Sequence, residues 1–296
     1  MRGAGKHMPR RVDGAHALRH YCGHGAARHG KRATRQRMAS NNVKSGPSGG
    51  LRAHVSGLLE TARTVIYAVL IALLVRTFAY EPFNIPSGSM IPTLLVGDYL
   101  FVSKFSYGYS KHSLPFSLPL FHGRILASEP ERGDVAVFKL PSDSSTDYIK
   151  RIVGLPVDRI QVISGVLHIN GEAVTRRRIE DYSYPSRFGG TRHAAQYIEV
   201  LPNGREHRII EEAGDFGALD NTPEYVVPEA HYFAMGDNRD NSADSRVTSQ
   251  VGFIPRENLV GRAEFLFFST DGSASLWEVW KWPFAIRYIR LFNGIL

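Results

Sequence analysis

Hydrophobic and polar residues follow three different patterns along the 296-residue chain. Residues 1–56 show no hydrophobic periodicity and are rich in Arg, His, Gly and Ser, which is typical of a disordered segment. Residues 64–75 are uncharged and mostly apolar. From residue 81 onward, short apolar runs alternate with polar turn residues, which is typical of β-strands. The patterns predict a tail over 1–56, an apolar helix over 57–80 and a domain over 81–296.

Several runs in the 81–296 domain have the length and composition of strands. They are residues 99–104, 134–139, 148–153, 159–163, 166–169, 231–235 and 262–268. Ser164-Gly165 and Asn170-Gly171 predict tight hairpin turns. Because few helical patterns interrupt these runs, we predict a mainly β fold with an antiparallel β-sheet domain. The polar stretch over about 172–225 is interpreted as an inserted subdomain that packs weakly.

The apolar helix can cross a membrane only if its flanking residues are included. Twelve residues at about 1.5 Å each span about 18 Å, whereas the hydrocarbon core of a bilayer is about 30 Å thick. Arg63 and Arg76 can extend toward the lipid headgroups from a span of about 61–80. A buried core helix and the apolar region of a signal peptide fit the same pattern. We favour one uncleaved transmembrane helix, since no convincing small-x-small cleavage site follows it.

The net charge of +8 is concentrated in the tail, which holds twelve Lys and Arg against one Asp. Positive residues favour the cytoplasmic side, so the 81–296 domain is expected on the opposite side of the membrane. An organelle transit peptide and a nucleic-acid-binding arm are alternative interpretations of the tail, and Met38 is an alternative start. Cys22 is the only cysteine, which excludes an intramolecular disulfide and a thiolate metal cluster.

The loop over 85–94 carries the first candidate chemistry. Pro86 and Pro92 restrict the backbone on either side, and Gly88 allows a turn where a side chain would clash. A serine held on such a stiff turn is suited to act as a nucleophile. An ordinary loop that follows a helix is the simpler interpretation of these residues alone.

Lys150 and Arg151 are adjacent cations inside the apolar run 148–153. Side chains alternate across a strand, so Lys150 shares a face with Tyr148 and Ile152, and Arg151 points the other way. Loss of solvation on that face lowers the pKa of Lys150, and a neutral amine can serve as a general base toward a serine. An edge-strand lysine that deters aggregation is the alternative.

Residues 236–246 are very polar and follow the apolar run 231–235. Their acidic and amide residues do not fit the spacing of a calcium-binding EF-hand loop, and no closing Glu follows. We therefore expect a hydrogen-bonded network that supports a site. Its expected members are Ser242 to orient an amine, the pair Asp244 with Arg246, and the pair Asp237 with Arg151.

Three blocks in this order resemble bacterial type I signal peptidases: IPSGSMIPTLLVGD, DYIKRIVGLP and GDNRDNSADSR. The flanking stretches EPF and RGDVAVF also match, and the resemblance covers about 81–160 and 231–268. It implies a membrane-bound serine endopeptidase that uses a Ser-Lys dyad and no metal or cofactor.

In that resemblance Ser89 matches the nucleophile and Lys150 the general base. The oxyanion donors are the Ser89 N–H and the Ser87 hydroxyl. Ser242 matches the serine that positions the lysine amine. Val157 stands where the family usually has glycine, and because valine does not readily adopt a positive φ, we expect the local turn to differ.

The resemblance also implies the substrate: preproteins whose signal peptides are cut after small-x-small (Ala-x-Ala) sites. An extended substrate can add a strand against 81–86 and 147–150. Shallow pockets that admit only small side chains are expected from Phe83, Ile85, Pro86, Met90, Leu94, Tyr148 and Ile149. The predicted location is the bacterial cytoplasmic membrane, with one span and the 81–296 domain on the outer, periplasmic face.

Membrane lipid is a second expected partner, and no nucleic acid is expected. Trp277, Trp280 and Trp282 crowd the C-terminal region and are interpreted either as an interfacial lipid contact or as core residues.

Three other functions use some of the same features. A self-cleaving, repressor-like protease also uses Ser-Lys chemistry on a β domain, but the apolar helix and the absence of a helix-turn-helix pattern disfavour it. A non-catalytic, membrane-tethered β binding module is disfavoured because Ser89, Lys150 and the 236–246 network are intact. An organelle inner-membrane peptidase differs only in its compartment.

Overall fold

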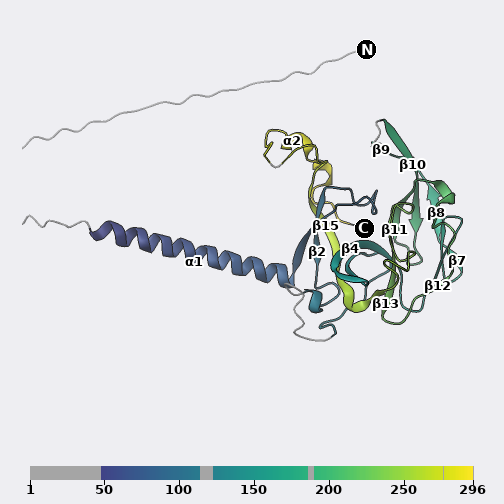
Figure 1. Cartoon of the computed structure of the whole chain (residues 1–296), viewed down its shortest axis with the longest axis horizontal. Helices are drawn as coiled ribbons and strands as arrows, with labels where there is room; N and C mark the ends of the chain where they lie inside the picture. The colour runs from purple at the N-terminus through teal and green to yellow at the C-terminus, as the bar shows by residue number, and fades with distance from the viewer. Residues whose placement is uncertain (1–47, 114–122, 186–189, 276, 296) are drawn as a thin grey trace, which may run out of the picture. The chain divides into compact units, whose positions relative to one another are not determined.

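The computed structural model describes residues 48–113, 123–185, 190–275 and 277–295. The predicted tail lies outside the described residues up to residue 47. Figure 1 shows the chain as one long helix, α1 (Ser48–Phe78), followed by β-strands. Because α1 begins at Ser48, the last part of the segment predicted as tail is helical.

Within α1, residues 57–78 are long and apolar enough to cross a membrane by length and composition, with a mean hydropathy of 2.0. Their side chains are exposed on every face of the helix; Leu70, Ile71 and Leu74 are each about half exposed or more. A helix that is apolar all round needs an apolar environment, which fits a transmembrane anchor.

The largest sheet has seven antiparallel strands in the order β1-β2-β15-β3-β4-β13-β14. In this order the strands are Tyr80–Asn84, Asp98–Ser103, Leu259–Ser269, Val135–Leu140, Asp143–Gly154, His231–Met235 and Ile254–Pro255. The prediction of a mainly β, antiparallel domain is confirmed. The structure extends the run predicted at 148–153 to twelve residues in β4.

Two four-stranded antiparallel sheets complete the domain among the described residues. The first contains β12 (Tyr225–Val226), β5 (Arg159–Ile163), β6 (Val166–Ile169) and β7 (Glu172–Ala173). The second contains β11 (Glu206–Glu211), β10 (Thr191–Val200), β8 (Thr175–Arg178) and β9 (Tyr182–Pro185). Short helices are η1 (Lys111–Ser113), η3 (Gly214–Phe216), η4 (Arg256–Asn258), α2 (Trp282–Ala285) and η5 (Tyr288–Arg290).

The expectation that residues 172–225 pack weakly is wrong. Ala194, Leu201, Ile209 and Ile210 on or beside β10 and β11 are at most 1% exposed. The stretch is polar for two reasons: solvent-facing strand positions carry polar residues, and several polar side chains are themselves buried, among them Gln196, Glu199 and His207.

The turns follow their local chemistry. Ser164-Gly165 and Asn170-Gly171 both adopt positive φ at the two central residues, which confirms the predicted hairpins. Val157 also adopts a left-handed conformation, with φ of 66°, so the valine side chain does not prevent a positive φ at this turn. Its N–H donates to Val227 O at 2.9 Å, and this contact holds the turn in place.

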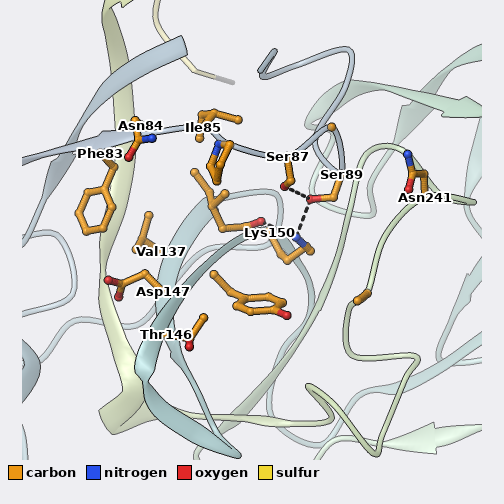
Figure 2. A pocket seen from close by; sticks show the side chains of 15 residues that line it. Phe83, Asn84, Ile85, Ser87, Ser89, Val137, Thr146, Asp147, Lys150 and Asn241 are labelled. Carbon is orange, nitrogen blue, oxygen red and sulfur yellow. Dashed lines mark hydrogen bonds between the residues drawn. The ribbon is translucent and has the colours of Figure 1, made fainter. Parts of the chain in front are cut away.

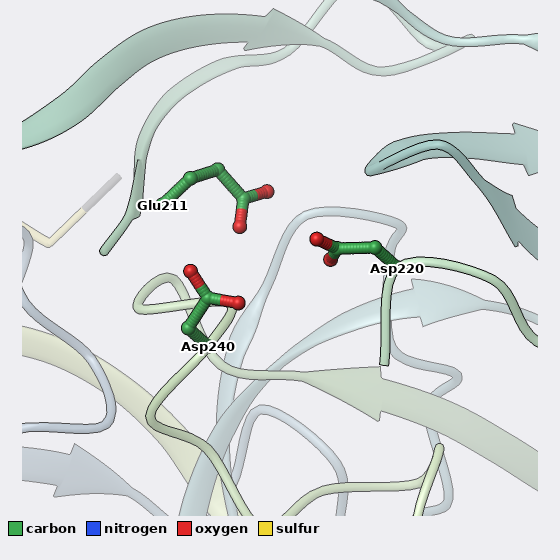
Figure 3. A group of neighbouring side chains, drawn as sticks. All are labelled: Glu211, Asp220 and Asp240. Carbon is green, nitrogen blue, oxygen red and sulfur yellow. The ribbon is translucent and has the colours of Figure 1, made fainter. Parts of the chain in front are cut away.

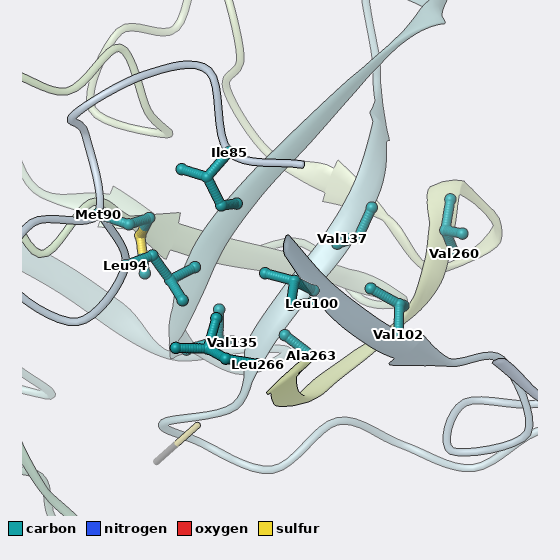
Figure 4. Close-up of a cluster of buried hydrophobic side chains, with 10 residues drawn as sticks. All are labelled: Ile85, Met90, Leu94, Leu100, Val102, Val135, Val137, Val260, Ala263 and Leu266. Carbon is teal, nitrogen blue, oxygen red and sulfur yellow. The ribbon is translucent and has the colours of Figure 1, made fainter. Parts of the chain in front are cut away.

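A cluster of buried apolar side chains lies beneath the loop over 85–94 (Figure 4). Ile85, Met90 and Leu94 from the loop pack with residues of the largest sheet, and each is at most 3% exposed. The sheet members are Leu100, Val102, Val135, Val137, Val260, Ala263 and Leu266. Burial of the three loop residues fixes the loop on the sheet and thereby fixes the serines between them.

Candidate active site

Ser89 is held by backbone contacts on both sides of the loop. The Ile85 N–H donates to Asp98 O at 2.9 Å, and the Leu94 N–H donates to Met90 O at 2.8 Å. The Asn238 N–H donates to Ser89 O at 3.1 Å, which joins the loop to the 236–246 segment. Ser89 is 8% exposed, so its hydroxyl has a defined position at the edge of a pocket.

Lys150 reaches Ser89 from β4. Its Nζ donates to Ser89 Oγ at 2.7 Å (Figure 2) and also to Ile149 O at 2.9 Å. The Lys150 amine lies 5.3 Å from the centroid of the Tyr148 ring, on the face that strand alternation predicts. The two residues singled out as candidate nucleophile and base are therefore in direct contact.

Burial lowers the pKa of Lys150 from 10.5 to about 8, while the negative charges of Asp244 and Asp237 oppose this shift. A substantial fraction of the amine is thus neutral at mildly alkaline pH. In that form Nζ can accept the proton of the Ser89 hydroxyl through the contact already present.

Ser87 lies beside the same hydroxyl. Its Oγ is 3.5 Å from Ser89 Oγ, and its side chain is exposed toward the pocket. A hydroxyl at this position can donate to negative charge that develops next to Ser89.

A cavity of about 560 Å³ opens in front of Ser89 and Lys150. Of the residues predicted to contact substrate, Phe83, Ile85, Pro86, Tyr148 and Ile149 line it. Met90 and Leu94 do not, because both are buried in the cluster beneath the loop. Residues that were not predicted as pocket walls also contribute to the lining: Asn84, Gly88, Val137, Thr146, Asp147, Asn241 and Ala243.

Two strand edges border this cavity. Among the described strands, β1 pairs only with β2, and β4 pairs with β13 only from Arg151 to Gly154. Phe83 and Asn84 on β1, and residues 146–150 on β4, all line the cavity. The backbone groups on these edges are thus able to pair with an extended segment that enters between them.

The Arg151 guanidinium lies on the opposite side of β4 and pairs with Asp237. Its Nε and Nη2 donate to the two carboxylate oxygens at 2.9 and 2.8 Å, and both residues are at most 1% exposed. Thr93 Oγ1 also donates to Asp237 at 2.5 Å. Burial opposes ionisation of Asp237, but Arg151 more than offsets it, so the pKa of this carboxyl is lowered.

The second predicted pair is also present. Arg246 donates from Nε and Nη2 to the two oxygens of Asp244, each at 2.9 Å. The Gly236 N–H donates to Asp244 Oδ2 at 3.0 Å, so the ion pair of Asp244 with Arg246 also holds the first residue of the 236–246 segment. Burial opposes ionisation of Asp244, and Arg246 again lowers the pKa overall.

Ser242 is placed differently from what we expected. Its Oγ is buried and forms no hydrogen bond with any described residue, Lys150 included. It lies against Gly236, where an added Cβ would come within 2.2 Å of Ser242 Oγ. The contact by which Ser242 was expected to orient the amine is therefore absent from this arrangement of the described residues.

A further buried pair was missed by sequence reasoning. Arg239 donates from Nη1 and Nη2 to the carboxylate of Glu199 on β10 at 3.0 and 2.5 Å. The Asn238 amide donates to Glu212 at 2.9 Å. The inserted strands thus brace the 236–246 segment, and only the fold brings these distant residues together.

Comparisons of the sequence with a family profile and with known proteins all find signal peptidases. The profile of the family described as "Signal peptidase, peptidase S26" matches residues 58–268. Signal peptidase I of Rickettsia canadensis (strain McKiel) is 46% identical over 251 residues, which cover 79% of this chain and 92% of the relative. Signal peptidase I of Rickettsia typhi (strain ATCC VR-144 / Wilmington) is 46% identical over 247 residues, covering 77% and 90%.

A crystal structure of a signal peptidase I from Enterococcus faecalis V583 is 22% identical and aligns with a TM-score of 0.28. The alignment covers 46% of this chain and 97% of that chain.

Proposed function

This chain belongs to the signal peptidase family, peptidase S26, and we propose that Ser89 and Lys150 perform its hydrolysis. Members of this family are serine peptidases that remove signal peptides. The contact of 2.7 Å between Lys150 Nζ and Ser89 Oγ supports this pair. Family membership decides against a repressor-like protease and against a non-catalytic module.

The neutral Lys150 amine removes the proton of Ser89 as Oγ attacks the carbonyl carbon of the scissile bond. The resulting oxyanion accepts hydrogen bonds from the Ser89 N–H and the Ser87 hydroxyl. Such a donor typically contributes about 3 kcal/mol of transition-state stabilisation. The Lys150 ammonium then protonates the leaving amine, and the regenerated amine activates water to hydrolyse the acyl-enzyme.

The substrate binds as an extended strand between β1 and β4 and pairs with their free edges. Phe83, Ile85 and Ile149 form apolar walls of the cavity that contains Ser89, and these walls reject large side chains by overlap. This favours cleavage after small-x-small sequences such as Ala-x-Ala.

Helix α1 anchors the chain in the bacterial cytoplasmic membrane, with the tail in the cytoplasm and the catalytic domain on the outer face. The apolar side chains exposed on the helix surface support the anchoring. The basic composition of residues 1–56 supports the orientation.

The experiment is cleavage of an Ala-x-Ala preprotein by the full chain in detergent. We expect Ser89→Ala and Lys150→Met each to lower kcat/KM by at least about 10³-fold, because they remove the nucleophile and the base. Lys111→Met is the matched control, since Lys111 is exposed and outside the cavity. Activity near the wild-type level in Lys150→Met would contradict the proposed pair.

A further inference from the structure

Three carboxylates from separate segments converge where the inserted strands meet the 236–246 segment (Figure 3). Glu211 ends β11, Asp220 follows η3, and Asp240 lies in the 236–246 segment. One oxygen atom of each carboxylate lies within 4.8 Å of those of the other two. Figure 3 shows the three groups directed toward one shared space.

The Glu211 carboxylate has an unusual environment. It is 1% exposed, and neither of its oxygens has a hydrogen-bond partner among the described residues. The nearest cation is Arg176, whose Nη1 is 3.9 Å away and whose Nη2 donates to Asp215 at 2.7 Å. Buried carboxylates are normally hydrogen-bonded or paired at close range, so Glu211 offers two buried acceptor oxygens that the described residues leave unused.

The other two carboxylates are oriented by the backbone. The Ala213 N–H donates to one oxygen of Asp240 at 2.7 Å, and the Gly217 N–H donates to one oxygen of Asp220. An added Cβ at Gly217 would lie 1.9 Å from Asp240 Oδ1 and 3.1 Å from Asp220 Oδ2. Only glycine at this position lets the two acids approach one another so closely.

Neighbouring arginines do not neutralise the cluster, because they are bound elsewhere. Arg239 pairs with Glu199, and Arg246 pairs with Asp244. The pKa of Glu211 is raised to about 8, chiefly by burial; Arg239 and Arg246 oppose the rise, and the charges of Asp220 and Asp240 contribute to it.

We propose that Glu211, Asp220 and Asp240 bind a divalent cation, and that this cation is Ca²⁺. Carboxylate oxygens are ligands of hard cations, and the cluster offers no nitrogen or sulfur. Calcium–oxygen distances are about 2.4 Å, so opposite ligands of one ion lie about 4.8 Å apart, which the cluster can accommodate. Calcium also tolerates irregular ligand geometry, whereas Mg²⁺ requires a near-ideal octahedron.

The ion has a structural role. It joins β11 and the segment after η3 to Asp240, and so ties the inserted strands to the segment that also carries Asp237 and Asp244. None of the three carboxylates lines the cavity in front of Ser89 and Lys150, so the cation would take no direct part in the proposed hydrolysis.

The test uses the full chain in detergent, treated with EDTA and then titrated with CaCl₂ or MgCl₂. We expect isothermal titration to show one Ca²⁺ bound per chain. Calcium at about 100-fold above its Kd should raise the midpoint of thermal unfolding by at least about 5 °C. Magnesium should produce a smaller rise.

Glu211→Gln and Asp220→Asn should each weaken Ca²⁺ binding at least about tenfold and remove the rise. Glu206→Gln is the matched control, because it makes the same change on an exposed residue of the same strand. The proposal is overturned if the wild-type chain binds no Ca²⁺. It is also overturned if Glu211→Gln binds Ca²⁺ as tightly as the wild type does. If the wild-type chain binds no Ca²⁺ and Glu211→Gln is more stable than the wild type, the carboxylates share a proton and not a metal ion.

Discussion

The Nζ atom of Lys150 lies 2.7 Å from Ser89 Oγ, although 61 positions separate the two residues. Both side chains are more than nine-tenths buried, so the contact is sheltered from bulk water. The state of the amine therefore controls whether the pair can react.

Activity should increase with pH through about 8, the value to which burial lowers the pKa of Lys150. Below this value the amine is protonated, and kcat/KM should fall by about tenfold for each pH unit. The measurement is kcat/KM of the full chain from pH 6 to 10 on a substrate without groups that titrate in this range. A flat profile, or an optimum in acid, would show that a different group acts as the base.

Replacing either Arg151 or Asp237 alone should strongly lower the free energy of unfolding, because the remaining partner is left buried without its counter-charge. Asp237→Ala leaves a buried, uncompensated guanidinium and should lower the free energy of unfolding by about 3–5 kcal/mol. Arg151→Met together with Asp237→Leu should recover much of this loss, because no charge is left buried.

Denaturant unfolding of the full chain in detergent measures both effects. Glu224→Ala is the control, since its pair with Arg159 is exposed and should contribute less than about 1 kcal/mol. Equal losses at Asp237 and Glu224 would mean that burial does not determine the strength of the first pair.

Val157→Gly should stabilise the protein by about 1 kcal/mol. Valine at φ of 66° stores backbone strain of about 1–2 kcal/mol, which exceeds the added flexibility of glycine in the unfolded chain. Val226→Gly is the matched control: this valine is also exposed but lies in β12, where glycine should destabilise. The measurement is the midpoint of thermal unfolding of both variants. A lower midpoint in Val157→Gly would show that contacts of the valine side chain stabilise the fold by more than the backbone strain destabilises it.

The C-terminal tryptophans should contact lipid. The chain has three tryptophans, Trp277, Trp280 and Trp282, which are 86%, 67% and 40% exposed, and residues nearby expose further apolar side chains. Tryptophan favours the membrane interface. In vesicles that contain the full chain, brominated lipids should quench the fluorescence strongly, whereas aqueous acrylamide should quench it weakly. The reverse result would place these side chains in water.

Much of the candidate site could be predicted from sequence because its determinants are local. Strand alternation places Lys150 and Arg151 on opposite faces, and prolines with one glycine mark the loop that presents Ser89. The hairpin turns could be predicted for the same reason, since Asn-Gly and Ser-Gly specify their own backbone conformation.

The failures concern contacts that only the folded chain creates. Met90 and Leu94 are apolar residues next to the nucleophile, and nothing in the sequence distinguishes a pocket wall from a core contact at these positions. The pair of Glu199 with Arg239 joins residues 40 positions apart on different elements. In β10 and β11 the buried positions include the polar residues Gln196, Glu199 and His207, so no alternation of apolar and polar residues marks these strands in the sequence.

The short connection between α1 and the nucleophile sets a geometric limit on what this protein can cut. Ser89 follows the last residue of α1 by eleven positions, and a chain extends at most about 3.6 Å per residue, so the hydroxyl stays within about 40 Å of the helix end. With α1 in the membrane, as proposed above, Ser89 reaches only a layer of about this depth beside the bilayer. Identical cleavage sequences deep inside an exported polypeptide pass beyond that layer, so distance from the lipid selects the substrate together with the residues at the cut.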